Sequence, residues 1–421
     1  MLKYIIKCTD ALKPVLIKII PIDVLRKIKR NLLSQNENKL SEIQIASFEK
    51  DKYPIGINLI GNIKGDSGLG QSCRLLANEL EHCGYPVCFY QHSVSKNLSM
   101  KDTSYDDKLK RDIKYGINIF HINPHEFAIS FVQLGKKFWD SHYNIAFWLW
   151  ELEEFPDEWL PCLNCVDEIW TPSEFTSASI RKKTDKPVVT IPYHIELKTD
   201  INISREDFGL PKDEFLFLMM YDQGSMTERK NPMAVIRAYK QAFTDKDEKV
   251  GLVIKVNNCT EEELKFLRSQ MDDYHRVYFI TETLSREQVN GLIACADAVV
   301  SLHRAEGFGL VLAEAMLLGT PVIATNWSSN TEFMTTDVSC LVDYKLIELQ
   351  EDLWMFKKGN RWADADISQA AEYMRKLYED REYGLQMAQR AKKHITECLS
   401  MQHAVSLINA RVERIYGEQK T

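Results

Sequence analysis

Two glutamates in a long apolar, glycine-rich stretch are the residues best suited to carry chemistry. Glu306 and Glu314 are separated by seven residues, and Glu306 follows a predicted buried strand. Gly307 and Gly309 stand after Glu306, and glycine lets the backbone approach a ligand closely at a helix start. The free amides there favour a phosphate or another electron-rich group. The stretch therefore predicts a polar ligand site.

Glu314 lies within a predicted helix over residues 310–318 that is otherwise apolar on every side. A helix of this kind is buried. A lone buried carboxylate is costly unless it is hydrogen-bonded, and desolvation raises its pKa. The vicinal hydroxyls of a ribose would satisfy it. The alternative is a hydrogen bond to neighbouring backbone or to an arginine.

Arg229 and Lys230 form a second candidate site, between a predicted strand and a predicted helix over residues 232–243. Cations at a helix start oppose the helix dipole. That mismatch favours a bound anion over the alternative, a solvated Arg-Lys pair.

Two further groups follow predicted strands near the start of the chain. Gly68 and Gly70 belong to a glycine-rich loop, and His121 ends a strand, with Asn123 and His125 as alternatives to it. A tight strand–helix turn also uses glycine, and a strand-end histidine is often structural. These residues are therefore weaker candidates.

Trp148 and Glu151 belong to a segment that combines aromatic side chains with carboxylates after another predicted strand. Both kinds of group suit sugar rings. An aromatic core followed by a solvated acidic turn would produce the same pattern.

Strands and helices alternate along the chain, which predicts parallel sheets covered on both faces. The expected strands span 54–61, 87–90, 117–122, 143–150, 168–171, 188–191, 215–221, 250–256, 277–280, 298–302 and 321–324. The expected helices span 71–83, 232–243, 261–271, 286–295, 310–318, 347–358, 366–380 and 382–418.

At 421 residues the chain is long for one core, so two doubly wound α/β domains are expected. We predict a helical extension and linker over residues 1–50, a first Rossmann-like domain over 51–197 and a second over 198–385. A C-terminal helix over 386–421 is expected to pack back on the first domain.

The net charge of -7 combines a basic start with an acidic body. An acidic body argues against a nucleic-acid-binding protein, which would need a basic face. Residues 1–33 are basic and amphipathic, and they contain no run of about 20 apolar residues. They fit a helix lying in an anionic membrane surface, or equally an extension packed on the body or on another subunit. The ten scattered cysteines fit a reducing compartment, and Cys162 and Cys165 have no second pair of zinc ligands nearby.

Residues 306–324 read E-G-F-G-L-x-L-x-E-A-M-x-x-G-x-P-V-I-A. This run resembles the E-x7-E signature of the group 1, retaining glycosyltransferases of the GT-B fold, and the resemblance covers roughly residues 54–400. It implies that Glu306 contacts a donor sugar and that Glu314 holds a ribose. It also implies that the backbone from Gly307 through Phe308, Gly309 and Leu310 holds the sugar and the phosphates.

The resemblance extends to the other candidates. Lys230 matches a phosphate-binding lysine, but Gly224 or Ser225 stands where the family usually has its arginine, so the basic pair is incomplete unless Arg229 substitutes. The resemblance implies three further roles. Gly68 and Gly70 would lie against the donor diphosphate or the acceptor, and His121 would contact the sugar. The segment from Thr281 to Leu284 would stack on the nucleobase. Trp148 and Glu151 would then face the acceptor.

The resemblance implies a transferase that moves a sugar from a nucleotide-sugar to a lipid-linked or polysaccharide acceptor, without a metal or other cofactor. O-antigen or capsule synthesis at the cytoplasmic face of the membrane is the expected setting. The alternatives are a non-catalytic GT-B partner subunit of a glycan-assembly complex and a GT-B sugar phosphorylase.

Overall fold

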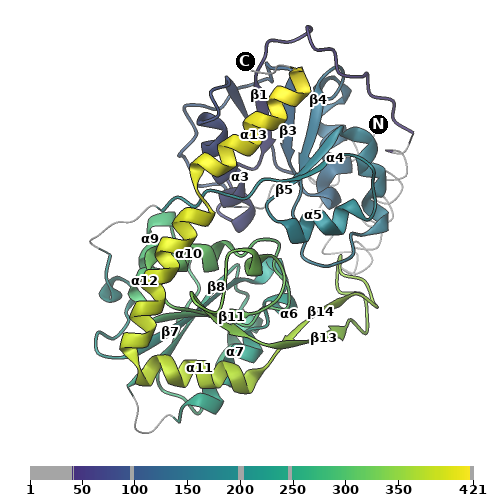
Figure 1. Cartoon of the computed structure of the whole chain (residues 1–421). Helices are drawn as coiled ribbons and strands as arrows, with labels where there is room; N and C mark the ends of the chain where they lie inside the picture. Colours follow the sequence, from purple (N-terminus) through teal and green to yellow (C-terminus); the bar gives the residue numbers. More distant parts are fainter. Residues whose placement is uncertain (1–39, 41, 95–98, 198–202, 245–248, 418–421) are drawn as a thin grey trace.

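The computed structural model describes residues 40, 42–94, 99–197, 203–244 and 249–417. The predicted amphipathic segment over 1–33 lies outside this part of the chain. Two α/β lobes are joined by a long C-terminal helical stretch that runs along both (Figure 1). None of the helices described has the length and apolar character needed to cross a membrane.

The N-terminal lobe is built on six parallel strands in the order β2-β1-β3-β4-β5-β6. Its strands are β1 Ile57–Gly61, β2 Val87–Gln91, β3 Ile117–His121, β4 Tyr143–Phe147, β5 Glu168–Thr171 and β6 Val188–Thr190, and its α-helices are α3 Gly68–Glu81, α4 Pro124–Leu134 and α5 Glu174–Arg181. All residues of β1 and β3 are buried, because helices cover both faces of the sheet.

The C-terminal lobe has a second sheet of six parallel strands in the order β12-β11-β10-β7-β8-β9. Its strands are β7 Phe215–Asp222, β8 Val250–Asn257, β9 Val277–Ile280, β10 Ala298–Ser301, β11 Val322–Thr325 and β12 Cys340–Val342. Its helices are α6 Thr227–Lys230, α7 Pro232–Ala242, α8 Glu261–Ser269, α9 Arg286–Cys295 and α10 Leu310–Leu318. The prediction of two doubly wound α/β domains is confirmed.

Short 3-10 helices occupy several connections: η1 Lys136–Phe138, η2 Asp157–Cys165, η3 Arg205–Phe208, η4 Gln223–Ser225 and η5 Ser329–Glu332. In both sheets the strand order reverses at one place, between β1 and β3 and between β7 and β10. In α/β sheets, ligands bind beyond the carboxyl ends of the strands at such a point.

The predicted helix over 347–358 is wrong. The chain forms an antiparallel hairpin there, of β13 Tyr344–Glu348 and β14 Arg361–Ala365. Residues 349–360 connect the two strands, and Phe356 within them is buried against Trp150 of the N-terminal lobe. Phe356, one of the apolar residues whose spacing predicts a helix, thus packs against the other lobe instead.

The helix predicted over 382–418 is two helices, α12 Arg381–Cys398 and α13 Met401–Tyr416, preceded by α11 Ile367–Glu379. The Ser400 side chain caps α13 by accepting a hydrogen bond from the backbone of His403. Helix α12 packs on α10 of the C-terminal lobe, whereas α13 packs on α3 of the N-terminal lobe. This stretch therefore ties the two lobes together.

Candidate active site

Lys230 and Glu306 meet at the reversal point of the C-terminal sheet. Lys230 follows β7 and Glu306 follows β10, and these strands are neighbours. The Lys230 ammonium donates a hydrogen bond to the Glu306 carboxylate. Nη1 of Arg229 lies 3.5 Å from the other carboxylate oxygen. Two cations and one carboxylate thus converge where an α/β sheet binds its ligands.

The Arg229 guanidinium is buried and is bonded mainly to the backbone of its own lobe. Nη1 donates to the carbonyl of Ala305 at 2.7 Å, and Nε and Nη2 donate to the carbonyl of Ser225 at 3.3 and 3.2 Å. Glu151 of the N-terminal lobe lies 3.8 Å away. Arg229 therefore braces the loops on either side of Lys230, and Ser225 contributes its carbonyl oxygen to that brace.

The electrostatics of the cluster favour a charged carboxylate. Burial raises the pKa of Glu306, but Lys230, Arg229 and His303 outweigh it and hold that pKa at about 2. Burial lowers the pKa of Lys230, and Glu306 opposes this effect. Two cations, Lys230 and Arg229, thus face two carboxylates, Glu306 and Glu151.

The loop from Gly307 to Gly309 is held by the N-terminal lobe. A Cβ on Gly307 would come within 3.3 Å of the carbonyl of Trp150, and the hydroxyl of Ser173 donates to the carbonyl of Gly307 at 3.0 Å. Gly309 has φ 96, a left-handed value that favours glycine, directly before Leu310 begins α10. The ring of Phe308 packs edge-on against Tyr193 at 4.9 Å. The loop thus lies between the lobes and presents the start of α10 there.

Glu314 is buried on α10, with 1% of its surface exposed. One carboxylate oxygen accepts a hydrogen bond from Arg286, the first residue of α9. The other oxygen has no hydrogen-bond partner among the residues that the structure describes. Burial raises the pKa of Glu314, and Arg286 opposes this. One oxygen of Glu314 is therefore bonded to an arginine, which is one of the alternatives stated for the sequence. The second oxygen can still accept a hydrogen bond.

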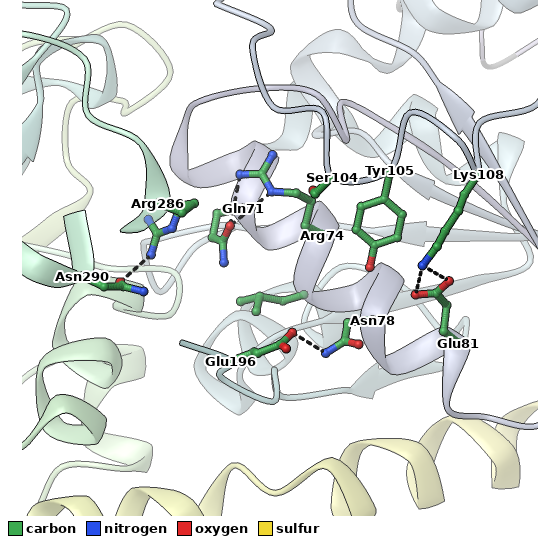
Figure 2. A pocket seen from close by; sticks show the side chains of 11 residues that line it. Gln71, Arg74, Asn78, Glu81, Ser104, Tyr105, Lys108, Glu196, Arg286 and Asn290 are labelled. Carbon is green, nitrogen blue, oxygen red and sulfur yellow. Dashed lines mark hydrogen bonds and ion pairs between the residues drawn. The ribbon is translucent and has the colours of Figure 1, made fainter. Parts of the chain in front are cut away.

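Arg286 borders a cavity of about 210 Å³ between α9 and α3. Figure 2 shows Arg286 and Asn290 on one side of it and Gln71, Arg74 and Asn78 of α3 on the other. Arg286 thus lines the cavity and also bonds the buried Glu314 carboxylate. Arg286 is not among the predicted site residues, although it follows Ser285, the capping residue of α9. A cation at a helix start, which pointed to Lys230, is also the signal that could have pointed to Arg286.

Gly68 and Gly70 lie in the first turn of α3 and meet different surroundings. A Cβ on Gly70 would lie 2.0 Å from the carbonyl oxygen of Gly65, whereas one on Gly68 would have nothing within 4 Å. The turn therefore requires glycine at position 70, because a side chain there would collide with the backbone of Gly65. At position 68 there is open space around the start of α3.

His121 ends β3 and is buried. Its Nε2 is hydrogen-bonded to the hydroxyl of Ser72 at 2.7 Å, and that hydroxyl also bonds Tyr193. The imidazole stacks on Phe147 at 5.1 Å. Burial lowers the pKa of His121 to about 4, so the ring is neutral at physiological pH. His121 and His125 both line a cavity of about 60 Å³.

The alternatives to His121 have different surroundings. Asn123 accepts a hydrogen bond from the backbone of Leu149 at 3.1 Å and so supports the loop after β4. Trp148, on that loop, is fully buried and stacks on Phe155 at 5.7 Å. Its predicted role at the acceptor is not what the structure shows, because the ring belongs to an aromatic core. Glu151 does face the site, beside Gly307 and Arg229.

Thr281 and Leu284 lie in the connection between β9 and α9, at the carboxyl edge of the C-terminal sheet, and Leu284 packs against the core. The structure does not bring them into contact with Lys230 or Glu306, since β8 separates β9 from β7.

Cys162 and Cys165 are buried, and burial raises the pKa of Cys165 to about 12.

Two facing Rossmann-like lobes with a polar cluster at the reversal point between them define the GT-B class of fold. Among solved structures, Anabaena HepE in complex with UDP and glucose has a TM-score of 0.61 at 14% identity, over 86% of this chain and 99% of that chain. Sucrose-phosphate synthase from Thermosynechococcus elongatus has a TM-score of 0.62 at 14% identity, with the same coverage. At this identity the likeness concerns the fold alone.

Residues 200–394 match the model of the family described as glycosyl transferases group 1. WclY, an O-antigen biosynthesis glycosyltransferase of Escherichia coli, is 29% identical over 158 residues, which are 37% of this chain and 41% of WclY. An uncharacterized glycosyltransferase of Methanocaldococcus jannaschii is 29% identical over 147 residues, which are 33% of this chain and 36% of that protein. The matches thus span well under half of each relative. Residues 200–394 are therefore similar to the group 1 glycosyltransferases.

Proposed function

We propose that this protein transfers a sugar, with retention of configuration, from a nucleotide-sugar donor to a hydroxyl of a glycan acceptor. The observation that carries the proposal is the convergence of Lys230, Arg229 and Glu306 beside the start of α10. Such a cluster suits a diphosphate whose charge grows as the sugar–phosphate bond breaks. UDP and glucose in the structure of HepE support a donor of this class.

In this proposal the residues divide the donor between them. Lys230 and the amides at the start of α10 stabilise the departing diphosphate, and Glu306 orients the sugar. Glu314 accepts hydrogen bonds from the ribose, for which its second oxygen is available. Glu151 approaches the cluster from the N-terminal lobe, where the acceptor would enter. The reaction needs no metal ion in this scheme.

The acceptor is proposed to be a lipid-linked or growing polysaccharide chain, in O-antigen or capsule synthesis. The name of WclY supports an O-antigen setting. The basic, amphipathic composition of residues 1–33 supports work at an anionic, cytoplasmic membrane surface.

The first test is a screen of UDP-, GDP- and dTDP-sugars for thermal stabilisation, which binding to the native state must produce. Lys230→Ala is then compared with the wild type for product formation. We expect a loss of about 10²- to 10³-fold, typical of removing one stabilising group at a developing charge. Lys249→Ala is the matched control, because Lys249 is an exposed lysine paired with Asp213 at the opposite edge of the sheet.

The outcomes separate the alternatives. Unchanged product formation in both Lys230→Ala and Glu306→Ala would mean that this chain is a non-catalytic partner. The absence of an arginine at 224 or 225 favours that second function. Donor consumption that requires phosphate and no glycan would instead indicate a phosphorylase.

A further inference from the structure

The hairpin of β13 and β14 forms an arm that reaches from the C-terminal lobe to the N-terminal lobe (Figure 1). Phe356, in the connection over 349–360, stacks on Trp150 at 5.2 Å. Lys357 pairs with Glu158 of the N-terminal lobe at 2.9 Å. These contacts hold the end of the arm on the N-terminal lobe.

Trp354 lies at the tip of the arm in an unfavourable backbone conformation. Leu353 and Phe356 exchange two backbone hydrogen bonds, of 2.8 and 2.9 Å, so Trp354 and Met355 are the central residues of a tight turn. Trp354 has φ 53, at a turn position where glycine is preferred. Its side chain is 63% exposed. An exposed tryptophan at such a position adds little to folding, which directs attention to a function.

The indole stands beside the cavity at the carboxyl edge of the N-terminal sheet. The rings of Trp354 and His125 meet edge to face at 5.5 Å, and His125 lines the cavity of about 60 Å³. His92 and His121 line it too, and burial lowers the pKa of each to about 4. Nε2 of His121 is bonded to Ser72 and Nε2 of His92 to Ser130, whereas Nδ1 of His121 is buried with no hydrogen-bond partner among the described residues. Such a nitrogen of a neutral imidazole can bond a hydroxyl group.

We propose that Trp354 and this cavity form a subsite for a pyranose ring of the acceptor. The sugar stacks its C–H face on the exposed indole, and one of its hydroxyls enters the cavity lined by His92, His121 and His125. An aromatic face beside neutral hydrogen-bonding groups matches a sugar ring, which is apolar on its faces and polar around its rim. The inference rests on the proposed function, because it names a subsite for the acceptor of that reaction.

The test uses Trp354→Gly and Trp354→Phe in the full chain. Glycine suits the turn, so Trp354→Gly should melt at least as high as the wild type. We expect it to bind methyl glycosides of the common hexoses and N-acetylhexosamines roughly three- to tenfold more weakly, as removal of an aromatic contact implies. Trp354→Phe should retain most of the affinity. Phe266→Ala removes an aromatic side chain that is 45% exposed on α8 and serves as the control.

Binding of UDP-, GDP- and dTDP-sugars is measured on the same variants and should not change. Equal glycoside affinity in the wild type and Trp354→Gly would overturn the proposal, and so would a wild type that binds none of the glycosides. Weaker nucleotide-sugar binding in Trp354→Gly would also reject it, since the turn would then support the donor site. A wild type that binds glycosides through Trp354 but no nucleotide-sugar would reject the proposed function and leave the subsite standing.

Discussion

Glu306 is the residue whose ionisation depends most on its neighbours in the site. Lys230 and Arg229 hold its pKa at about 2, below the ordinary value of 4.5. A carboxylate with a depressed pKa stabilises the folded state above the ordinary value and loses that contribution as the pH falls through the folded value. Most of the loss in folding stability that comes from Glu306 therefore falls between about pH 4.5 and 2.

This predicts a difference between the wild type and Glu306→Gln in acid. The wild type should lose more free energy of unfolding over that window than the variant does, because protonation of Glu306 removes its attraction to Lys230 and Arg229. The variant should lack this component. Urea denaturation at a series of pH values measures it, and parallel pH profiles for the two proteins would contradict the prediction.

At the scale of elements, the start of α3 offers a matched pair of glycines. Gly70→Ala places a Cβ against the carbonyl oxygen of Gly65, and backbone cannot yield as a side chain would. We expect it to lower the free energy of unfolding by about 1–3 kcal/mol. Gly68→Ala meets open space and should be neutral or stabilising by up to about 1 kcal/mol. Urea denaturation checks both, and equal losses would show that the turn does not depend on Gly70.

Most elements were predictable because each has its own periodicity and its own boundary residues. The strands from β1 to β11 follow short apolar runs, and α9 begins at the capping residue Ser285. The hairpin of β13 and β14 was not predictable in this way. Its connection is stabilised by Phe356 against Trp150, a contact between residues more than 200 positions apart.

At the scale of the whole molecule, α13 is fastened to the N-terminal lobe by a buried ion pair. Glu168 is fully buried and accepts hydrogen bonds from Arg411 at 2.8 and 2.6 Å, from Trp170 at 2.7 Å and from Tyr143 at 3.0 Å. Every oxygen of this carboxylate is thus satisfied. The pair connects the last helix to the sheet of the first lobe.

Arg411→Ala should therefore cost about 3–5 kcal/mol, because it leaves Glu168 charged and buried without its cation. Amide hydrogen exchange in α13 should accelerate, and the added change Glu168→Gln should recover part of the stability. Arg414→Ala, an exposed arginine on the same helix, is the control and should change stability by less than about 0.5 kcal/mol. Slow exchange in α13 of Arg411→Ala would show that other contacts hold the helix.

The sequence by itself determined the two α/β lobes and the Glu306, Lys230 and Glu314 candidates, because strands, helix starts and a lone acid in an apolar helix are local patterns. Only the tertiary structure decided what these side chains meet. It pairs Glu314 with Arg286, commits Arg229 to the carbonyls of Ala305 and Ser225, and buries Trp148 in the core. The physical reason is that hydrogen bonds, ion pairs and aromatic contacts depend on distances between residues remote in the chain. Local periodicity carries no information about those distances.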